Sequence, residues 1–219
     1  MDHDLLAAWF PTPEDVDPAW ARRHELADHL RTAVEELVTL DVDAVGERAL
    51  EELAADLAAV RGRLEAMGDV RHHGPLALAP LPAGSLVERS PVSGRSNVVA
   101  PPLVVDAYGE VTRAHAVFGD QYHGPPGGVH GGIVAAVFDE LLGIAQIGCG
   151  TAGHTGTLTI RYRALTPLYT RVDYEAECVG REGRKLFVTG RSTVDGRVTA
   201  EAEATFILTA EAAARADGG

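Results

Sequence analysis

The chain has 219 residues, of which 46% are hydrophobic, enough for one sizeable core and an appended element. Its formal net charge of −13 argues against a nucleic-acid-binding surface, although locally placed cations could still hold an anionic ligand. The two cysteines, Cys149 and Cys178, are too few for a disulfide framework or a cysteine zinc cluster, and no metal site is expected.

The N-terminal stretch MDHDLLAAWF is too acidic for a secretory or transit signal. No apolar run is expected to reach the length of a membrane span, so no membrane contact is expected either. We therefore expect a cytoplasmic protein.

Residues 1–84 are expected to form an N-terminal unit of two helices followed by a linker. Asp17-Pro18 supplies a helix cap and a first-turn proline. Alternating spacings of four and three connect the apolar residues of the first helix (Leu26, Leu30, Ala33, Leu37, Leu40) and of the second (Leu50, Leu53, Leu57, Val60, Leu64, Met67). That spacing is typical of a coiled-coil seam and predicts an antiparallel hairpin, packed on itself or on a partner subunit. A lid over a binding site is the alternative. Residues 68–84, rich in Pro, Gly and Ala, read as the linker.

Residues 85–210 are expected to form a second domain, in which short β-rich segments surround one helix at about residues 131–148. The expected strands are residues 86–90, 98–106, 110–118, 155–164, 171–180, 184–194 and 197–208. Turn signals at 181–183 and 195–196 predict a meander for the last three. Because the helix is apolar on most sides, we expect a curved antiparallel sheet to wrap around it, in an α+β fold. Residues 211–219 are expected to be a disordered tail.

The run GPPGGVHGGIVAAVFDELLG changes abruptly from a Gly/Pro loop into this apolar helix. Gly131 and Gly132 place backbone N–H groups at the helix start, where they could stabilise an oxyanion, although a glycine pair can also serve only the turn. Asp139 interrupts an apolar run and is therefore a candidate base or nucleophile. Its neighbour Glu140 must lie on another face of the helix.

Gly131 and Asp139 are eight residues apart, which corresponds to roughly 12 Å along a helix. An oxyanion donor and its base must both lie about 3 Å from the reacting centre, so one helix can hardly supply both. Two antiparallel copies related by a twofold axis could supply them together. The spacing therefore predicts a homodimer with two composite sites, and a tetramer is not excluded.

The strand at residues 155–164 alternates, and its polar residues are expected to share one face (Thr155, Thr157, Thr159, Arg161, Arg163). Thr155 and Arg161 would lie about 20 Å apart, which suits a long ligand with a reactive centre and a distant phosphate. A solvated strand face is the equal alternative. Arg184 and Lys185, the latter the single lysine of the chain, could bind phosphate or protect a hairpin end.

The pattern HGG followed by an aspartate, together with TLTIRYRALTPL and EGRKLFVTGRSTVDGRVTAEAEATFIL, resembles the PaaI-type hotdog-fold acyl-CoA thioesterases. These belong to the 4-hydroxybenzoyl-CoA thioesterase-like superfamily. The chain looks most like the branch with the mammalian long-chain acyl-CoA thioesterase superfamily members. The resemblance covers residues 124–208, is looser over 85–123, and finds no counterpart for the hairpin.

The resemblance implies a hotdog fold and hydrolysis of an acyl-CoA thioester. It implies that Asp139 acts as nucleophile or base for water, that Gly131 is the oxyanion donor, and that Thr155 orients water or the aspartate. It also places His130 among the catalytic residues and Gly132 among the substrate-binding residues. The implied substrate-binding residues are Arg161, Arg163, Arg184, Lys185, Leu186, Phe187, Val188 and Thr189. Coenzyme A is expected as part of the substrate, with no separate cofactor.

Gly124 replaces an asparagine that some PaaI-type enzymes carry six residues before the histidine of the motif. Its polar contact is absent or supplied by His123, which makes short aryl substrates less expected. Two other functions stay open: an acyl-CoA-binding or regulatory protein without turnover, and a hotdog hydratase or dehydratase. The second is disfavoured because those enzymes carry a histidine at the position of Ile144. A purely structural oligomerisation protein is the weakest alternative.

Overall fold

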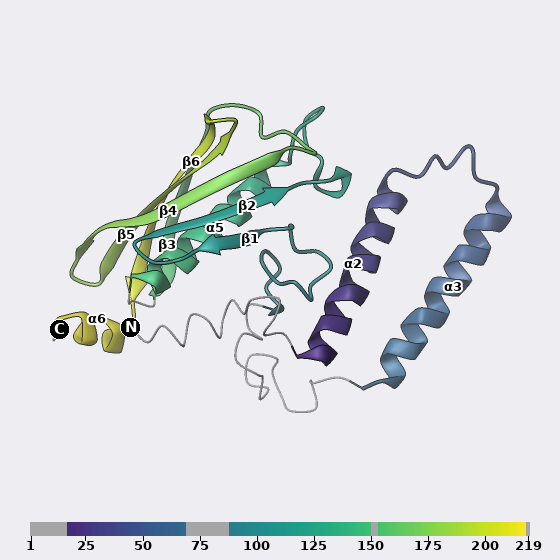
Figure 1. The fold of residues 1–219 in the computed structure, drawn as a ribbon, viewed down its shortest axis with the longest axis horizontal. Coiled ribbons are helices and arrows are strands. Elements are labelled where there is room, and N and C mark those ends of the chain that lie inside the picture. Colours follow the sequence, from purple (N-terminus) through teal and green to yellow (C-terminus); the bar gives the residue numbers. More distant parts are fainter. Residues whose placement is uncertain (1–16, 69–87, 150–152, 218–219) are drawn as a thin grey trace.

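The computed structural model describes residues 17–68, 88–149 and 153–217. Two helices, α2 (Pro18–Val38) and α3 (Glu47–Ala66), stand beside an α+β domain (Figure 1). That domain contains, in chain order, β1 (Val104–Ala107), β2 (Val111–Val117), the short 3-10 helix η4 (Asp120–Tyr122), α5 (Gly131–Gly148), β3 (Gly153–Tyr162), β4 (Arg171–Glu182), β5 (Lys185–Val194), β6 (Arg197–Leu208) and α6 (Ala210–Asp217). The expected linker lies largely outside the described residues.

The six strands form one antiparallel sheet in the order β1-β2-β4-β5-β6-β3, which wraps around α5 (Figure 1). The predicted meander of β4, β5 and β6 is confirmed. Gly183 occupies a φ of +56° between β4 and β5, while Asp195 and Gly196 have φ of +50° and +77° between β5 and β6. These left-handed conformations belong to the tight turns that twisted hairpins prefer.

The core lies between α5 and the concave face of the sheet. Five residues of β6 alternate into it and are buried (Ala200, Ala202, Ala204, Phe206, Leu208), and the alanines let the helix approach closely. From α5, Val134, Val137, Phe138, Leu141 and Leu142 are almost fully buried. Phe138 meets Tyr174 of β4 edge-to-face, with ring centroids 5.6 Å apart. The predicted hotdog fold is confirmed.

One sequence expectation about α5 is wrong. The helix spans 18 residues and is long and apolar enough to cross a membrane by length and composition. In this fold the sheet covers it, and eight of its residues are buried. A helix enclosed by a sheet becomes apolar on most sides for that reason.

Three expected segments differ from the structure. No strand forms at residues 88–90, and the strand expected at 98–106 begins only at Val104. Serine, proline and glycine dominate residues 90–102 and favour local turns: the Ser90 hydroxyl accepts from the N–H groups of Val92 and Ser93. The tail expected to be disordered instead forms α6 up to Asp217, because Ala212 and Ala213 are buried against the core.

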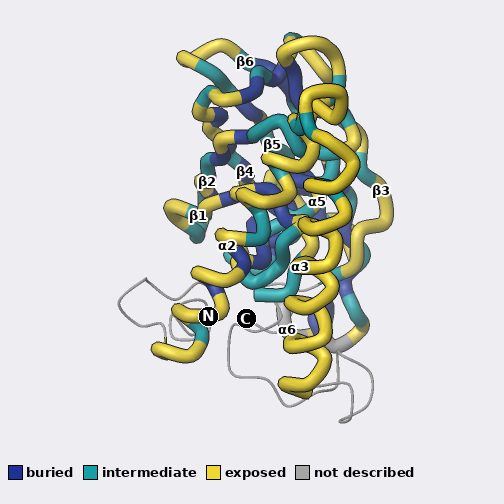
Figure 2. Tube along the Cα trace, turned by 90° about the vertical axis from the view of Figure 1, so that its right-hand side faces the viewer, coloured by how far each residue is buried: buried dark blue, intermediate teal, exposed yellow. Residues whose placement is uncertain are grey.

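The two predicted N-terminal helices are present, and α2 lies between the sheet domain and α3 (Figure 1). Asp17 caps α2 by accepting from the Ala19 N–H at 2.8 Å. Helix α2 is docked through the buried residues His24 and Ala27. Helix α3 has no buried residue, and Figure 2 shows it exposed along its length.

Candidate functional site

The start of α5 uses its two glycine amides differently. His130 is the N-cap, and its Nδ1 accepts the Gly132 N–H at 3.0 Å. The Gly131 N–H donates to no group among the residues that the structure describes. Tyr162, at the end of β3, donates its hydroxyl to the Gly131 carbonyl at 2.8 Å and so ties the helix start to the sheet. One of the two predicted amides therefore remains available as an oxyanion donor.

The loop before α5 is held by backbone bonds. The Gly124 N–H donates to the Gly128 carbonyl at 2.9 Å, and the His130 N–H donates to the Tyr122 carbonyl at 2.8 Å. Tyr122 is buried and donates its hydroxyl to the Ala100 carbonyl; burial raises the pKa of Tyr122 to about 12. A Cβ at Gly124 would lie 2.5 Å from the His130 Cα. The backbone has no room there for the family's asparagine.

Asp139 and Glu140 diverge as expected from their adjacency. The Thr155 hydroxyl donates to Asp139 Oδ1 at 3.1 Å, joining α5 to the start of β3. Glu140 instead accepts from the hydroxyls of Ser90 (2.8 Å) and Ser93. Asp139 is exposed in the single chain, although it interrupts an apolar run. The structure thus brings together Asp139 and Thr155, as the resemblance implied.

The expectation that Thr155 shares a face with Arg161 is wrong. The pairing of β3 with β6 shifts between Thr155, opposite Phe206, and Thr157, opposite Thr205. The intervening Gly156 forms a β-bulge, which reverses the alternation of side chains. Thr155 therefore shares the helix-facing side with the buried Phe206, while Thr157, Thr159 and Arg161 point to the outer face.

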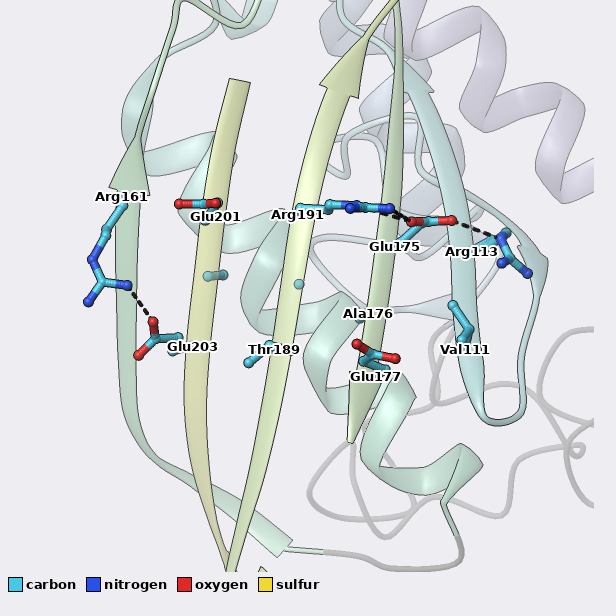
Figure 3. A pocket seen from close by; sticks show the side chains of 12 residues that line it. Val111, Arg113, Arg161, Glu175, Ala176, Glu177, Thr189, Arg191, Glu201 and Glu203 are labelled. Carbon is cyan, nitrogen blue, oxygen red and sulfur yellow. Dashed lines mark hydrogen bonds and ion pairs between the residues drawn. The ribbon is translucent and has the colours of Figure 1, made fainter. Parts of the chain in front are cut away.

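Arg161 and Arg163 lie at an outer face rich in ion pairs. Arg161 pairs with Glu203, and Arg163 pairs with Glu201 at 2.7 Å. A shallow depression of about 610 Å³ occupies this face, and Arg161 forms one side of it (Figure 3). Across it, Glu175 bridges Arg113 and Arg191, which hold its pKa below the usual value. The depression and the Asp139–Thr155 pair are on opposite faces, so a single ligand cannot contact both without passing around the sheet edge.

The segment expected to contact coenzyme A is divided between the same two faces. Leu186 and Val188 are buried under α5, so their side chains belong to the core. Lys185, Phe187 and Thr189 alternate to the outer side, and Arg184 donates through Nε to the Leu208 carbonyl at 3.0 Å. Phe206 is paired with both Thr155 and Leu186. Leu186 is therefore level with Thr155, two strand spacings or roughly 10 Å away, and Lys185, at the start of the strand, is level with His154.

Sequence reasoning missed two groups that hold the site. Tyr162 was not among the predicted site residues, yet it anchors the helix start. Its position on the helix-facing side of the strand, next to a helix that begins with glycines, was the available signal. Ser90 and Ser93 hold Glu140 from a segment that the sequence placed near a strand, and no local pattern marked them.

Comparison with known proteins finds similarity to thioesterases, in sequence and in structure. No model of a known protein family matches the chain. The acyl-coenzyme A thioesterase THEM4 of Mus musculus is 40% identical over 86 residues, or 38% of this chain and 37% of that protein. THEM4 of Xenopus laevis is 34% identical over 91 residues, or 41% of each. The chain thus spans less than half the length of the curated relatives it matches.

One solved structure is similar over nearly the whole chain. It is described as a thioesterase superfamily protein and is 30% identical. It superposes with a TM-score of 0.71, covering 84% of this chain and 94% of that one. At this identity and coverage, the likeness extends beyond the central fold to most of the sequence. The chain therefore belongs to the thioesterase superfamily of hotdog-fold proteins.

Proposed function

We propose that the protein is an acyl-CoA thioesterase, which converts an acyl-CoA and water into the free acid and coenzyme A. The observation that carries this proposal is the hydrogen bond from Thr155 to Asp139, at 3.1 Å, on a helix whose first N–H group is available. A carboxylate oriented by a hydroxyl is suited to attack a thioester or to activate water. The similarity to acyl-CoA thioesterases supports the same substrate class.

We propose that each active site combines two copies of the chain. The helix separates Gly131 from Asp139 by eight residues, or about 12 Å, so the Gly131 amide must come from the second copy. β3 lies at the edge of the sheet, and most of its ten residues are exposed in the single chain. A long unpaired edge strand readily pairs with another strand, and this edge adjoins Asp139.

In the proposed reaction, the Gly131 N–H polarises the thioester carbonyl and stabilises the oxyanion that forms on it. Asp139 either attacks the carbonyl carbon, giving an acyl-aspartyl anhydride that water hydrolyses, or removes a proton from the attacking water. In both routes the carbon–sulfur bond breaks, the CoA sulfur leaves as thiolate and then takes a proton, and one water is consumed. We propose Arg184 and Lys185 for the phosphates of coenzyme A.

The direct test replaces Asp139 by asparagine and measures thiol release across acyl-CoA esters of different chain lengths. We expect Asp139→Asn to lower kcat at least about 100-fold, because it removes the base or nucleophile. Glu140→Gln is the matched control: it makes the same chemical change one residue along and is expected to stay active. A folded Asp139→Asn protein with unchanged hydrolysis would refute the assignment.

The composite site is tested by mixing two inactive variants. Gly131→Pro removes the N–H at the first helical position, where proline fits, and His130 already has the extended ψ of 131° that precedes proline well. Hybrid dimers of Gly131→Pro and Asp139→Asn would contain one intact site. Random mixing should then restore about a quarter of wild-type activity if each site joins two chains. No recovery from confirmed hybrids would show that the site lies within one chain.

A further inference from the structure

Helix α3 has an apolar stripe that the described part of the chain leaves largely uncovered. The stripe consists of Leu50, Leu53, Leu57, Val60 and Leu64 and, at the C-cap of the helix, Met67, at alternating spacings of three and four. All but the partly covered Leu50 are exposed, from 37% for Val60 to 74% for Met67. Charged residues occupy much of the rest of the helix. A stripe with this strict spacing is the seam by which one helix pairs lengthwise with another.

We propose that α3 pairs antiparallel with α3 of a second copy of the chain. When the centre of the stripe is placed on a twofold axis, all six residues find apolar partners. Leu57 meets Val60 of the second copy, Leu53 meets its Leu64, and Leu50 meets its Met67. In each of these contacts, a residue at the first apolar position of the heptad in one helix meets a residue at the second apolar position in the other. Antiparallel helix pairs require this arrangement, and every residue of the stripe has a partner in it.

The charges that flank the seam agree with this register. Asp56 precedes Leu57 and Arg63 precedes Leu64, so both lie on the same flank of the stripe. In the antiparallel pair Asp56 lies beside Arg63 of the second copy, and the twofold axis forms this opposite-charge contact twice. Neither residue has an ion-pair partner among the described residues.

A parallel pair is less consistent with the same residues. It would direct Asp56 to Arg61 of the second copy, but Arg61 already pairs with Glu65 of its own helix at 3.4 Å. Parallel two-stranded coiled coils favour β-branched residues at the first seam position of each heptad and leucine at the second. Here the first positions are Leu50, Leu57 and Leu64, and the β-branched Val60 is at a second position.

Disulfide trapping in the full-length protein tests the pairing. Leu50 and Met67 are 17 residues apart, or about 25 Å along α3, so they cannot be linked within one helix. We expect mild oxidation of Leu50→Cys/Met67→Cys to shift the chain to a covalent dimer, with the 50–67 link identified in its peptides. The wild type controls for the native cysteines. Leu50→Cys alone should give no 50–50 link; such a link would indicate parallel pairing and overturn the proposal, as would a double variant that forms no link.

Four further variants of the same trapping protein show whether the seam itself makes the contact. Leu57→Glu places a charge in the central layer and should abolish the covalent dimer. Ala58→Glu, one residue away on the exposed opposite side, is the matched control and should retain it. Asp56→Arg should reduce the link several-fold, and adding Arg63→Asp should restore it. Equal trapping in all four would overturn the proposal. Because trapping reports this contact alone, its outcome is independent of whether the protein hydrolyses acyl-CoA.

Discussion

Helices α5 and α3 are similar in length but differ in what covers them. α5 has 18 residues, eight of them buried, and the sheet wraps around it. α3 has 20 residues and none buried, although its apolar stripe is regular. The difference shows that an apolar pattern specifies a helix that requires a partner, but not where that partner comes from. For α5 the same chain supplies it; for α3 we infer a second copy.

Helix α2 is intermediate between these cases, because polar contacts attach it to the hotdog domain. His24, which is 4% exposed, donates through Nε2 to Glu88 at 2.7 Å. Glu35 accepts from the Asp120 N–H at 3.3 Å and from the Tyr169 hydroxyl at 3.4 Å. Helix α2 thus attaches the N-terminal unit to the hotdog domain, and α3 lies on the far side of α2 (Figure 1).

The largest expected loss of stability comes from a substitution in the buried helix α5. Phe138→Ala should lower the free energy of unfolding by about 3–5 kcal/mol, because it leaves a cavity between α5 and Tyr174. Leu57→Ala in α3 removes a side chain that is 47% exposed, and should cost well under about 1 kcal/mol in the isolated chain. Denaturant unfolding at low protein concentration measures both. Equal losses would show that α3 is buried within its own chain.

A smaller effect is expected where α2 meets the domain. His24→Ala leaves the Glu88 carboxylate without its buried donor, although Ser96 still donates to it at 2.8 Å. The cost should be about 1–3 kcal/mol and should appear as faster hydrogen exchange in α2 with little change in α5. Arg22→Ala removes only an exposed pair with Glu25 and serves as the control. Unchanged exchange in α2 would mean that other contacts hold it.

The smallest effect concerns the outer face of the sheet, where exposed charges are paired within the chain. Arg191 and Arg113 lower the pKa of Glu175. A carboxyl whose folded-state pKa is depressed stabilises the fold above its unfolded pKa, and that contribution is lost as the pH falls through the folded value. Glu175→Gln should therefore cost about 0.2–1 kcal/mol at pH 7, and the difference from wild type should vanish in acid. Thermal unfolding across pH measures this, with Glu177→Gln as control; a difference that persists in acid would assign the effect to packing.

Local patterns in the sequence were sufficient for much of the fold. The Gly/Pro run that ends at His130 and the apolar run after it placed α5 correctly at residues 131–148. Turn glycines at Gly183 and Gly196 placed the meander, because only certain residues adopt positive φ easily. The spacing of Gly131 and Asp139 likewise follows from helical geometry alone. These features depend on near neighbours in the chain, so they can be read without the tertiary structure.

Tertiary structure decided what depends on distant partners. The bulge at Gly156 exists because β6 offers one residue fewer than β3, and it turns Thr155 toward Asp139 and away from Arg161. Burial of Ala212 and Ala213 made a helix of a segment that looked like a frayed end. The alternation of polar and apolar residues in a strand, and their periodicity in a helix, predict which residues share a face over a few positions. Whether two faces meet depends on strand register and packing, which residues far apart in the sequence determine together.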